Sequence, residues 1–136
     1  ADLASKEIKV AKDLAADLPL IKGDSNRLHQ VFLNIILNAV QAIHSKGSIS
    51  IITRQADFTN KAGMRTQGIE IKVENNGPEI PATIQQQIFD TFFTTKKEGL
   101  GLGLSITLNI INEHDGMLSL TSDSHKTTFT VYLPRG

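Results

Sequence analysis

Three glycines that alternate with leucines form the first stretch of this sequence that could do chemistry. They are Gly99, Gly101 and Gly103, and an apolar segment with helical spacing follows them directly. Glycine lets a ligand approach the backbone closely, and free N–H groups at a helix start point at one spot together with the positive end of the helix dipole. This stretch is therefore either an anion-binding loop or a flexible loop whose leucines pack against the protein.

A row of carboxamides is the second such feature. Gln30, Asn34, Asn38 and Gln41 are separated by four, four and three residues, so they share one face if this segment is a helix. Asparagine is costly in an apolar environment unless its amide has a partner. These side chains therefore either contact neighbouring loops and water, or they face a cavity where their oxygens hold a hard cation such as Mg²⁺.

The carboxamides lie on the clearest predicted helix, which begins at an N-cap provided by Asp24 or Ser25. Its apolar residues recur at three- and four-residue steps, and they are Leu28, Val31, Phe32, Ile35, Ile36, Ala39, Val40 and Ile43. Leu33 and Leu37 add apolar surface elsewhere on the helix, which predicts that most of its sides are covered. Gly47 is the predicted stop.

The other segments predict a sheet with helices on one face. Strands are expected at an edge within residues 6–20, and at 48–58, 68–74, 117–122 and 127–133. A short helix is expected at 82–89 and a longer one at 104–114, which Gly116 would end, whereas 91–103 lacks periodicity and predicts a lid. This order of elements indicates an α/β fold in two layers.

The composition is that of an ordinary globular protein. With 136 residues, 40% hydrophobic and 21% charged, the chain suits one domain, and its ends suggest a piece of a longer polypeptide. Lys plus Arg and Asp plus Glu both number 14, which argues against nucleic acid or an anionic membrane as a partner. Without cysteine there is no disulfide, zinc thiolate site or thiol nucleophile, which fits the cytosol.

Several ordered segments resemble the motifs of the ATP-binding domain of sensor histidine kinases, within the superfamily that includes gyrase, Hsp90 and MutL. Residues 34–42 (NIILNAVQA) resemble the N box, 73–81 (VENNGPEIP) the G1 box, 89–96 (FDTFFTTK) the F box, 99–104 (GLGLGL) the G2 box, and 127–134 the closing strand. Their order and spacing agree over essentially the whole chain. The resemblance implies a Bergerat fold, in which a mixed, mostly antiparallel sheet of about five strands carries three helices on one face.

The resemblance also implies a site for Mg-ATP between the N-box helix and the lid. Asn38 would bind Mg²⁺, and Gln30 and Asn34 would be the catalytic residues, with Gln30 orienting a water or a hydroxyl. The implied ATP-binding positions are Asn34, Asn38, Gln41, Asn75, Gly77, Ile80, Phe89, Lys96, Gly99, Leu100, Gly101, Leu102, Gly103, Leu104 and Thr127. For Lys96, a solvated pair with Lys97 is the equal alternative.

By the same resemblance, the chain is part of a protein-histidine kinase. The γ-phosphoryl group would pass to a histidine on a separate dimerisation domain of the same parent protein and then serve a cognate response regulator. Four histidines are present, namely His29, His44, His114 and His125, and none lies in a segment that resembles the phosphoacceptor helix. The acceptor is therefore expected outside this chain. The domain itself is expected in the cytoplasm, without membrane contact, whether or not its parent is membrane-anchored.

Three residues depart from the family pattern. Asn75 stands where the G1 box has an Asp that accepts a hydrogen bond from the adenine amino group, Glu79 replaces the second G1 glycine, and Lys126 replaces a glycine before Thr127. A charged acceptor strengthens a hydrogen bond by about 1–2 kcal/mol, so the loss predicts roughly tenfold weaker ATP binding.

These departures keep two other interpretations open. One is a degenerate, kinase-derived domain that binds ATP weakly or not at all and acts through protein contacts, and Asn75 would then be either natural drift or a change introduced to silence the site. The other is a serine kinase of the same fold that phosphorylates an anti-sigma antagonist, which the F-box-like segment and long lid disfavour.

Overall fold

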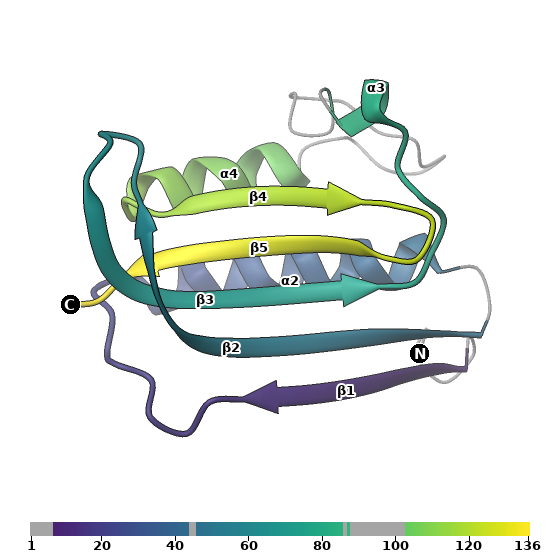
Figure 1. The fold of residues 1–136 in the computed structure, drawn as a ribbon, viewed down its shortest axis with the longest axis horizontal. Coiled ribbons are helices and arrows are strands. Elements are labelled where there is room, and N and C mark those ends of the chain that lie inside the picture. Colours follow the sequence, from purple (N-terminus) through teal and green to yellow (C-terminus); the bar gives the residue numbers. More distant parts are fainter. Residues whose placement is uncertain (1–6, 44–45, 86, 88–102) are drawn as a thin grey trace.

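The computed structural model describes residues 7–43, 46–85, 87 and 103–136, and they form a five-stranded mixed sheet with its two long helices against one face (Figure 1). The strands are β1 (Ile8–Leu14), β2 (Gly47–Thr59), β3 (Arg65–Asn75), β4 (Met117–Ser122) and β5 (Thr127–Pro134), and their order is β1-β2-β3-β5-β4. The described helices are α2 (Ser25–Ala42), α3 (Ala82–Gln85) and α4 (Gly103–Glu113). The predicted two-layer, mostly antiparallel architecture is confirmed.

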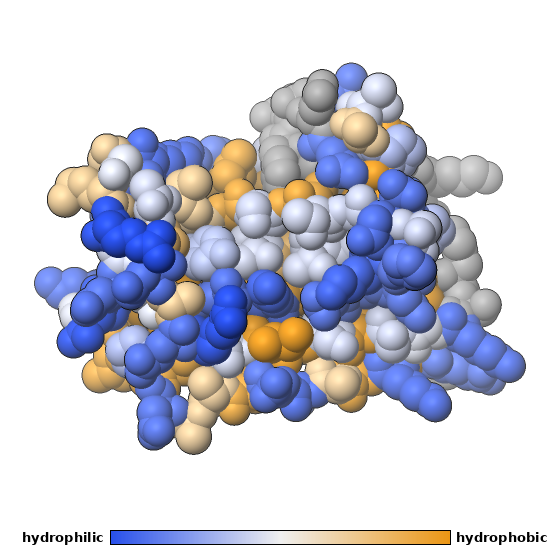
Figure 2. Space-filling view, viewed as in Figure 1, coloured by the Kyte–Doolittle hydropathy of each residue, from blue (hydrophilic) through white to orange (hydrophobic). Residues whose placement is uncertain are grey.

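Alternating residues build the sheet. β2 and β3 form the expected antiparallel hairpin, with register from Ile49 opposite Asn75 to Thr59 opposite Arg65. β1 is the predicted edge strand and pairs parallel with β2. The apolar residues of β3 face the helices, whereas the charged ones lie on the opposite, open face, which is mostly hydrophilic (Figure 2).

The core lies between this sheet and the helices. Its fully buried members come from both long helices and from β2, β3 and β5, and they include Val31, Ile35, Ala39, Ile49, Val73, Ile110, Ile111, Phe129, Val131 and Leu133. The expectation that α2 is covered on most sides is wrong, because Leu33 and Leu37 are 47% and 43% exposed. Both lie about half a turn from the buried Ile35 and so point away from the sheet.

The start of α2 confirms the predicted N-cap, whereas the C-terminal ends of α2 and α4 differ from the prediction. Asp24 is the N-cap of α2, since its carboxylate accepts hydrogen bonds from the N–H groups of Asn26 (3.0 Å) and Arg27 (3.2 Å). α2 ends at Ala42, and Gly47 belongs to β2. α4 ends in a left-handed residue, but this is Asp115 (φ 58°) rather than Gly116.

Gly116 has a different role. Its N–H donates to the Ile111 carbonyl (3.0 Å), and that of Asp115 donates to the Asn112 carbonyl (3.1 Å), which is a Schellman pattern. A Cβ on Gly116 would lie 2.4 Å from the Tyr132 carbonyl oxygen, so the glycine permits close contact with β5.

Candidate functional site

The end of β3 and the start of β5 lie at the same end of the sheet, where α2 ends and α4 begins (Figure 1). Asn75, the last residue of β3, pairs with Ile49 of β2 and Thr127 of β5. Asn75 is 3% exposed and Thr127 is 2% exposed. Two buried polar side chains therefore occupy neighbouring strand ends, as expected from their sequence positions.

Asn75 is held in one orientation by the turn that follows it. Its Oδ1 accepts a hydrogen bond from the Gly77 N–H at 2.9 Å. Since a backbone N–H can be matched only by an acceptor, the Asn75 oxygen is directed at Gly77, and Nδ2 occupies the other position of the amide plane. Nδ2 has no hydrogen bond to any residue within the described ranges, so it is the group that this side chain can offer to a ligand.

Gly77 joins this turn to the end of α2. A Cβ at this position would lie 2.9 Å from the Ala42 carbonyl oxygen and 3.0 Å from Asn75 Oδ1. Neither group can move far, because one is helix backbone and the other is buried beside the strand. Gly77 is therefore required for the close approach of the turn to α2.

A chain of hydroxyl groups fixes the rest of the G1 segment (residues 73–81). Ser122 Oγ accepts a hydrogen bond from the Ile80 N–H (2.9 Å) and lies 2.7 Å from Thr127 Oγ1. Sequence reasoning selected Ile80 and Thr127 but missed Ser122. The signal was the polar turn between β4 and β5, which places residues 122 and 127 opposite each other in the register.

Asn76 was also missed. Its Oδ1 accepts a hydrogen bond from the Ser48 N–H (2.8 Å), and its own N–H donates to the Ser48 carbonyl (3.3 Å). Asn76 therefore anchors the turn to the start of β2. Its side-chain oxygen, like that of Asn75, accepts a hydrogen bond from a backbone N–H.

The carboxamide row on α2 divides between two environments. Asn34 Nδ2 donates to Thr107 Oγ1 on α4 at 3.4 Å, and Thr107 is fully buried. Asn38 is half-buried one helical turn later, whereas Gln30 and Gln41 are exposed. Asn34 is therefore the member of the row that is bonded to α4.

α4 begins at Gly103, with Leu104 buried (9% exposed) behind it. The prediction of a helix directly after the glycine stretch is thus confirmed. The remaining predicted site residues, Phe89, Lys96, Gly99, Leu100, Gly101 and Leu102, lie outside the described residues.

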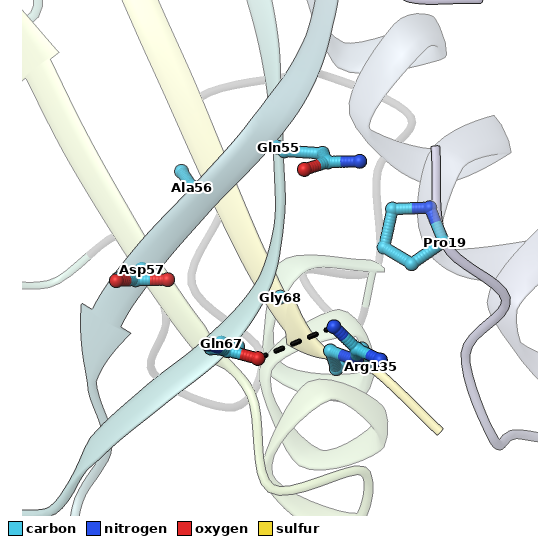
Figure 3. A pocket seen from close by; sticks show the side chains of 7 residues that line it. All are labelled: Pro19, Gln55, Ala56, Asp57, Gln67, Gly68 and Arg135. Carbon is cyan, nitrogen blue, oxygen red and sulfur yellow. Dashed lines mark hydrogen bonds between the residues drawn. The ribbon is translucent and has the colours of Figure 1, made fainter. Parts of the chain in front are cut away.

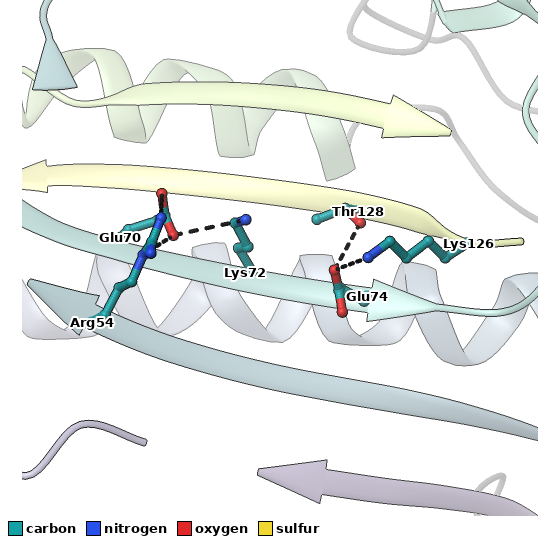
Figure 4. A network of polar contacts seen from close by, with 6 residues as sticks. All are labelled: Arg54, Glu70, Lys72, Glu74, Lys126 and Thr128. Atoms are coloured by element: carbon teal, nitrogen blue, oxygen red, sulfur yellow. Dashed lines mark hydrogen bonds and ion pairs between the residues drawn. The ribbon is translucent and has the colours of Figure 1, made fainter. Parts of the chain in front are cut away.

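Two of the three departures from the family pattern do not enter the buried part of this site. Lys126 is exposed and makes an ion pair with Glu74 (3.0 Å) on the open face of the sheet, and Thr128 also donates to Glu74 (3.3 Å) (Figure 4). Glu79 is exposed. Asn75 is therefore the departure with a buried side chain at the site.

A second polar network lies farther along the open face. Arg54 and Lys72 lie 2.7 and 3.9 Å from Glu70, which is 3% exposed (Figure 4). Burial disfavours the ionised Glu70, but hydrogen bonds from Arg54 and Tyr132 and the charges of Arg54 and Lys72 outweigh it and lower the Glu70 pKa. Burial and the hydrogen bond to Glu70 raise the pKa of Tyr132. This network links side chains of β2, β3 and β5 on the open face, and it does not include the candidate site residues.

A small pocket of about 140 Å³ lies at the opposite end of β3 (Figure 3). It is lined by Pro19, Gln55, Ala56, Asp57, Gln67, Gly68 and Arg135. Arg135 Nη1 donates to Gln67 Oε1 (3.2 Å), and Gln55 donates to the Asp17 carbonyl (2.6 Å), so much of its polar lining is engaged. It is smaller than typical cofactor sites, which have volumes of about 300–1,000 Å³.

The described ranges contain neither a metal-ligand cluster nor a membrane-spanning helix. No group of three His, Asp or Glu residues there could hold a metal ion. No helix in the same ranges is long and apolar enough to cross a membrane.

Comparison with known proteins bears on the whole arrangement. Residues 23–136 match the family described as histidine kinase-, DNA gyrase B- and HSP90-like ATPases. The chain is 39% identical over 134 residues to the sensor histidine kinase ZraS of Escherichia coli, covering 98% of this chain and 27% of that protein. It is 38% identical over 129 residues to the sensory histidine kinase/phosphatase NtrB of Klebsiella oxytoca, covering 93% of this chain and 37% of that protein. The chain thus spans about a quarter to a third of these relatives.

Solved structures of histidine kinases share the fold of this chain. The nucleotide-free catalytic domain of histidine kinase ThkA superposes with a TM-score of 0.81 at 30% identity, over 98% of this chain and 82% of that one. A structure of ThkA in complex with the response regulator protein TrrA superposes with a TM-score of 0.76 at 29% identity, over 98% of this chain and 36% of that one.

Proposed function

This chain belongs to the family of histidine kinase-, DNA gyrase B- and HSP90-like ATPases, as an ATP-binding catalytic domain of the sensor histidine kinase type, and we propose that it binds Mg-ATP where β3 ends and β5 begins. The observation that carries the location is the turn at Asn75–Gly77, which packs closely against the end of α2. The segment that follows this turn is linked at Ile80 through Ser122 to Thr127. A buried amide with an available donor, held in one orientation by the turn, suits a polar ligand.

At the base end, we assign Asn75, Gly77, Ile80 and Thr127 to nucleotide binding. Asn75 offers Nδ2 directly, and Gly77 lets the turn that holds Asn75 pack against the end of α2. Thr127 and Ile80 are held in place by Ser122. These residues bind and orient the base and need take no part in the chemical step.

At the phosphate end, Asn38 would hold Mg²⁺ through its amide oxygen, because hard cations prefer oxygen ligands. When bound, Mg²⁺ neutralises charge on the phosphates. Gln30 and Asn34 are the proposed catalytic residues. Gln41 on α2 and Leu104 on α4 are proposed to contact the nucleotide, and the backbone of residues 99–103 is proposed to contact the phosphates. Phe89 and Lys96 are assigned to the lid. Phosphoryl transfer requires positioning and charge stabilisation more than covalent participation by the protein.

The parent protein is proposed to transfer the γ-phosphoryl group to a histidine of its own dimerisation domain and to serve a response regulator. The relatives are sensor histidine kinases, and ThkA has been solved with its response regulator. His114, which directly follows α4, is poorly suited as the phosphoryl acceptor because both of its ring nitrogens are engaged. Nε2 accepts a hydrogen bond from the Asp24 N–H (3.0 Å), and Nδ1 lies 2.8 Å from the Ile110 carbonyl oxygen. The cytoplasm, which supplies ATP, is the proposed location.

Calorimetric titration with ATP tests the proposal, with and without Mg²⁺. We expect saturable binding at micromolar to millimolar nucleotide, and Asn38→Ala should remove most of the Mg²⁺ dependence. Asn26→Ala, the same substitution in the exposed first turn of α2, is the control and should bind as the unchanged chain does. No saturable binding of a purine nucleotide at millimolar concentration would refute the function and favour the degenerate, protein-binding alternative.

A further inference from the structure

We infer that Asn75 gives this site a preference for a purine with an oxygen at C6 over one with an amino group there. The inference rests on the proposed function, because it requires a purine nucleotide at the Asn75 end. It concerns the identity of the base and is independent of how the phosphates are held.

The first step is the orientation of the amide. Asn75 is 3% exposed and its Oδ1 is bonded to the Gly77 N–H at 2.9 Å. If the Asn75 amide were flipped, Nδ2 would face the Gly77 N–H. Two donors would then oppose each other, and the Gly77 N–H would lose its acceptor. Such an unmet donor is expensive in a buried setting, so the oxygen remains with Gly77.

The second step is the chemistry of the remaining position. A carboxylate in this place would satisfy Gly77 with one oxygen and present its second oxygen, an acceptor, to the ligand. The carboxamide presents Nδ2, which is a donor and has no hydrogen bond to a described residue. Where the C6 substituent of a purine faces Nδ2, a 6-aminopurine places a donor against this donor, whereas a 6-oxopurine places an acceptor there.

The third step concerns the neighbours that could restore an acceptor. Asn76 uses its amide oxygen for the Ser48 N–H, and the Thr127 hydroxyl is paired with Ser122. Lys126 is paired with Glu74 on the open face of the sheet. The acceptor that Asn75 lacks is therefore not supplied by Asn76, whose oxygen is directed at the start of β2, or by Lys126, which is a donor. The Thr127 hydroxyl is engaged with Ser122 but retains acceptor capacity.

The test compares ATP with inosine triphosphate, which keeps the sugar and phosphates and changes the purine at C6 and N1. We expect calorimetry of the unchanged chain with Mg²⁺ to give an inosine triphosphate affinity at least equal to that for ATP. In Asn75→Asp, which retains an acceptor for Gly77, the ratio should reverse by about tenfold or more in favour of ATP.

Asn76→Asp is the matched control. It introduces the same charge one residue away and keeps an acceptor for Ser48, so its affinity ratio should equal that of the unchanged chain. The inference is overturned if the unchanged chain binds ATP tenfold more tightly than inosine triphosphate, and this outcome does not depend on whether Asn75→Asp folds. It is also overturned if a folded Asn75→Asp has the same ratio of ATP affinity to inosine triphosphate affinity as the unchanged chain. Absence of binding by either nucleotide to any variant refutes the proposed function as well, which separates the two failures.

Discussion

Replacing Ser122 by alanine should destabilise the protein because this hydroxyl is shared by two partners. It accepts from the Ile80 N–H (2.9 Å) and lies 2.7 Å from Thr127 Oγ1, and Thr127 is 2% exposed. In Ser122→Ala, the Ile80 N–H would lose its acceptor and the Thr127 hydroxyl would lose its hydrogen-bond partner. A hydrogen bond of this kind contributes about 1 kcal/mol, and an unmet buried group costs about 1–3 kcal/mol, so we expect a loss of about 2 kcal/mol.

Urea unfolding of Ser122→Ala and Ser119→Ala measures this loss. Ser119 is on the same strand and is exposed, so its variant should stay within about 0.5 kcal/mol of the unchanged chain. For this chain length, a loss of about 2 kcal/mol corresponds to a fall in Tm of roughly 6–10 °C. A double-mutant cycle with Thr127→Val should give a coupling energy above about 0.5 kcal/mol. Equal stability of the two serine variants, or strict additivity in the cycle, would refute the reasoning.

Three further predictions concern single side chains. Gly77→Ala should cost about 1–3 kcal/mol in urea unfolding, because its Cβ would meet the Ala42 carbonyl at 2.9 Å, and an unchanged midpoint would contradict this contact. Lys126→Ala should leave nucleotide affinity in calorimetry unchanged, since its ion pair with Glu74 lies on the open face, and a tighter complex would show that it obstructs the site. Glu70 has a lowered pKa in the folded protein, so its contribution to stability is complete above its unfolded pKa and is lost as pH falls through the folded one. Glu70→Gln should therefore lower stability at pH 7 and flatten the acid limb of the stability profile, and a parallel profile would count against this assignment.

The regular elements could be predicted from the sequence because their signals are local. Alternation in β2 and β3 and the N-cap at Asp24 depend on residues that lie near one another in the chain. The parallel pairing of β1 with β2 does not, since it joins residues about 40 positions apart.

The site could be predicted only in part, because its geometry depends on tertiary contacts. The motif order selected Asn75, Gly77 and Thr127 as site residues, but Ser122 contacts Ile80 only because the β4–β5 hairpin places it there. Likewise, spacing showed that the carboxamides share a face of α2, whereas the packing of α4 decides that Asn34 contacts Thr107.

The contact between Gly77 and the Ala42 carbonyl also bears on how relatives of this chain should be interpreted. A main-chain oxygen cannot be removed by substitution, so the demand for a glycine here persists whether or not a ligand is ever bound. A descendant that had abandoned nucleotides would still be under selection to keep Gly77 simply to remain folded. The presence of this glycine in a sequence therefore indicates that the turn can pack against the helix end, and by itself it is no sign that a nucleotide is bound.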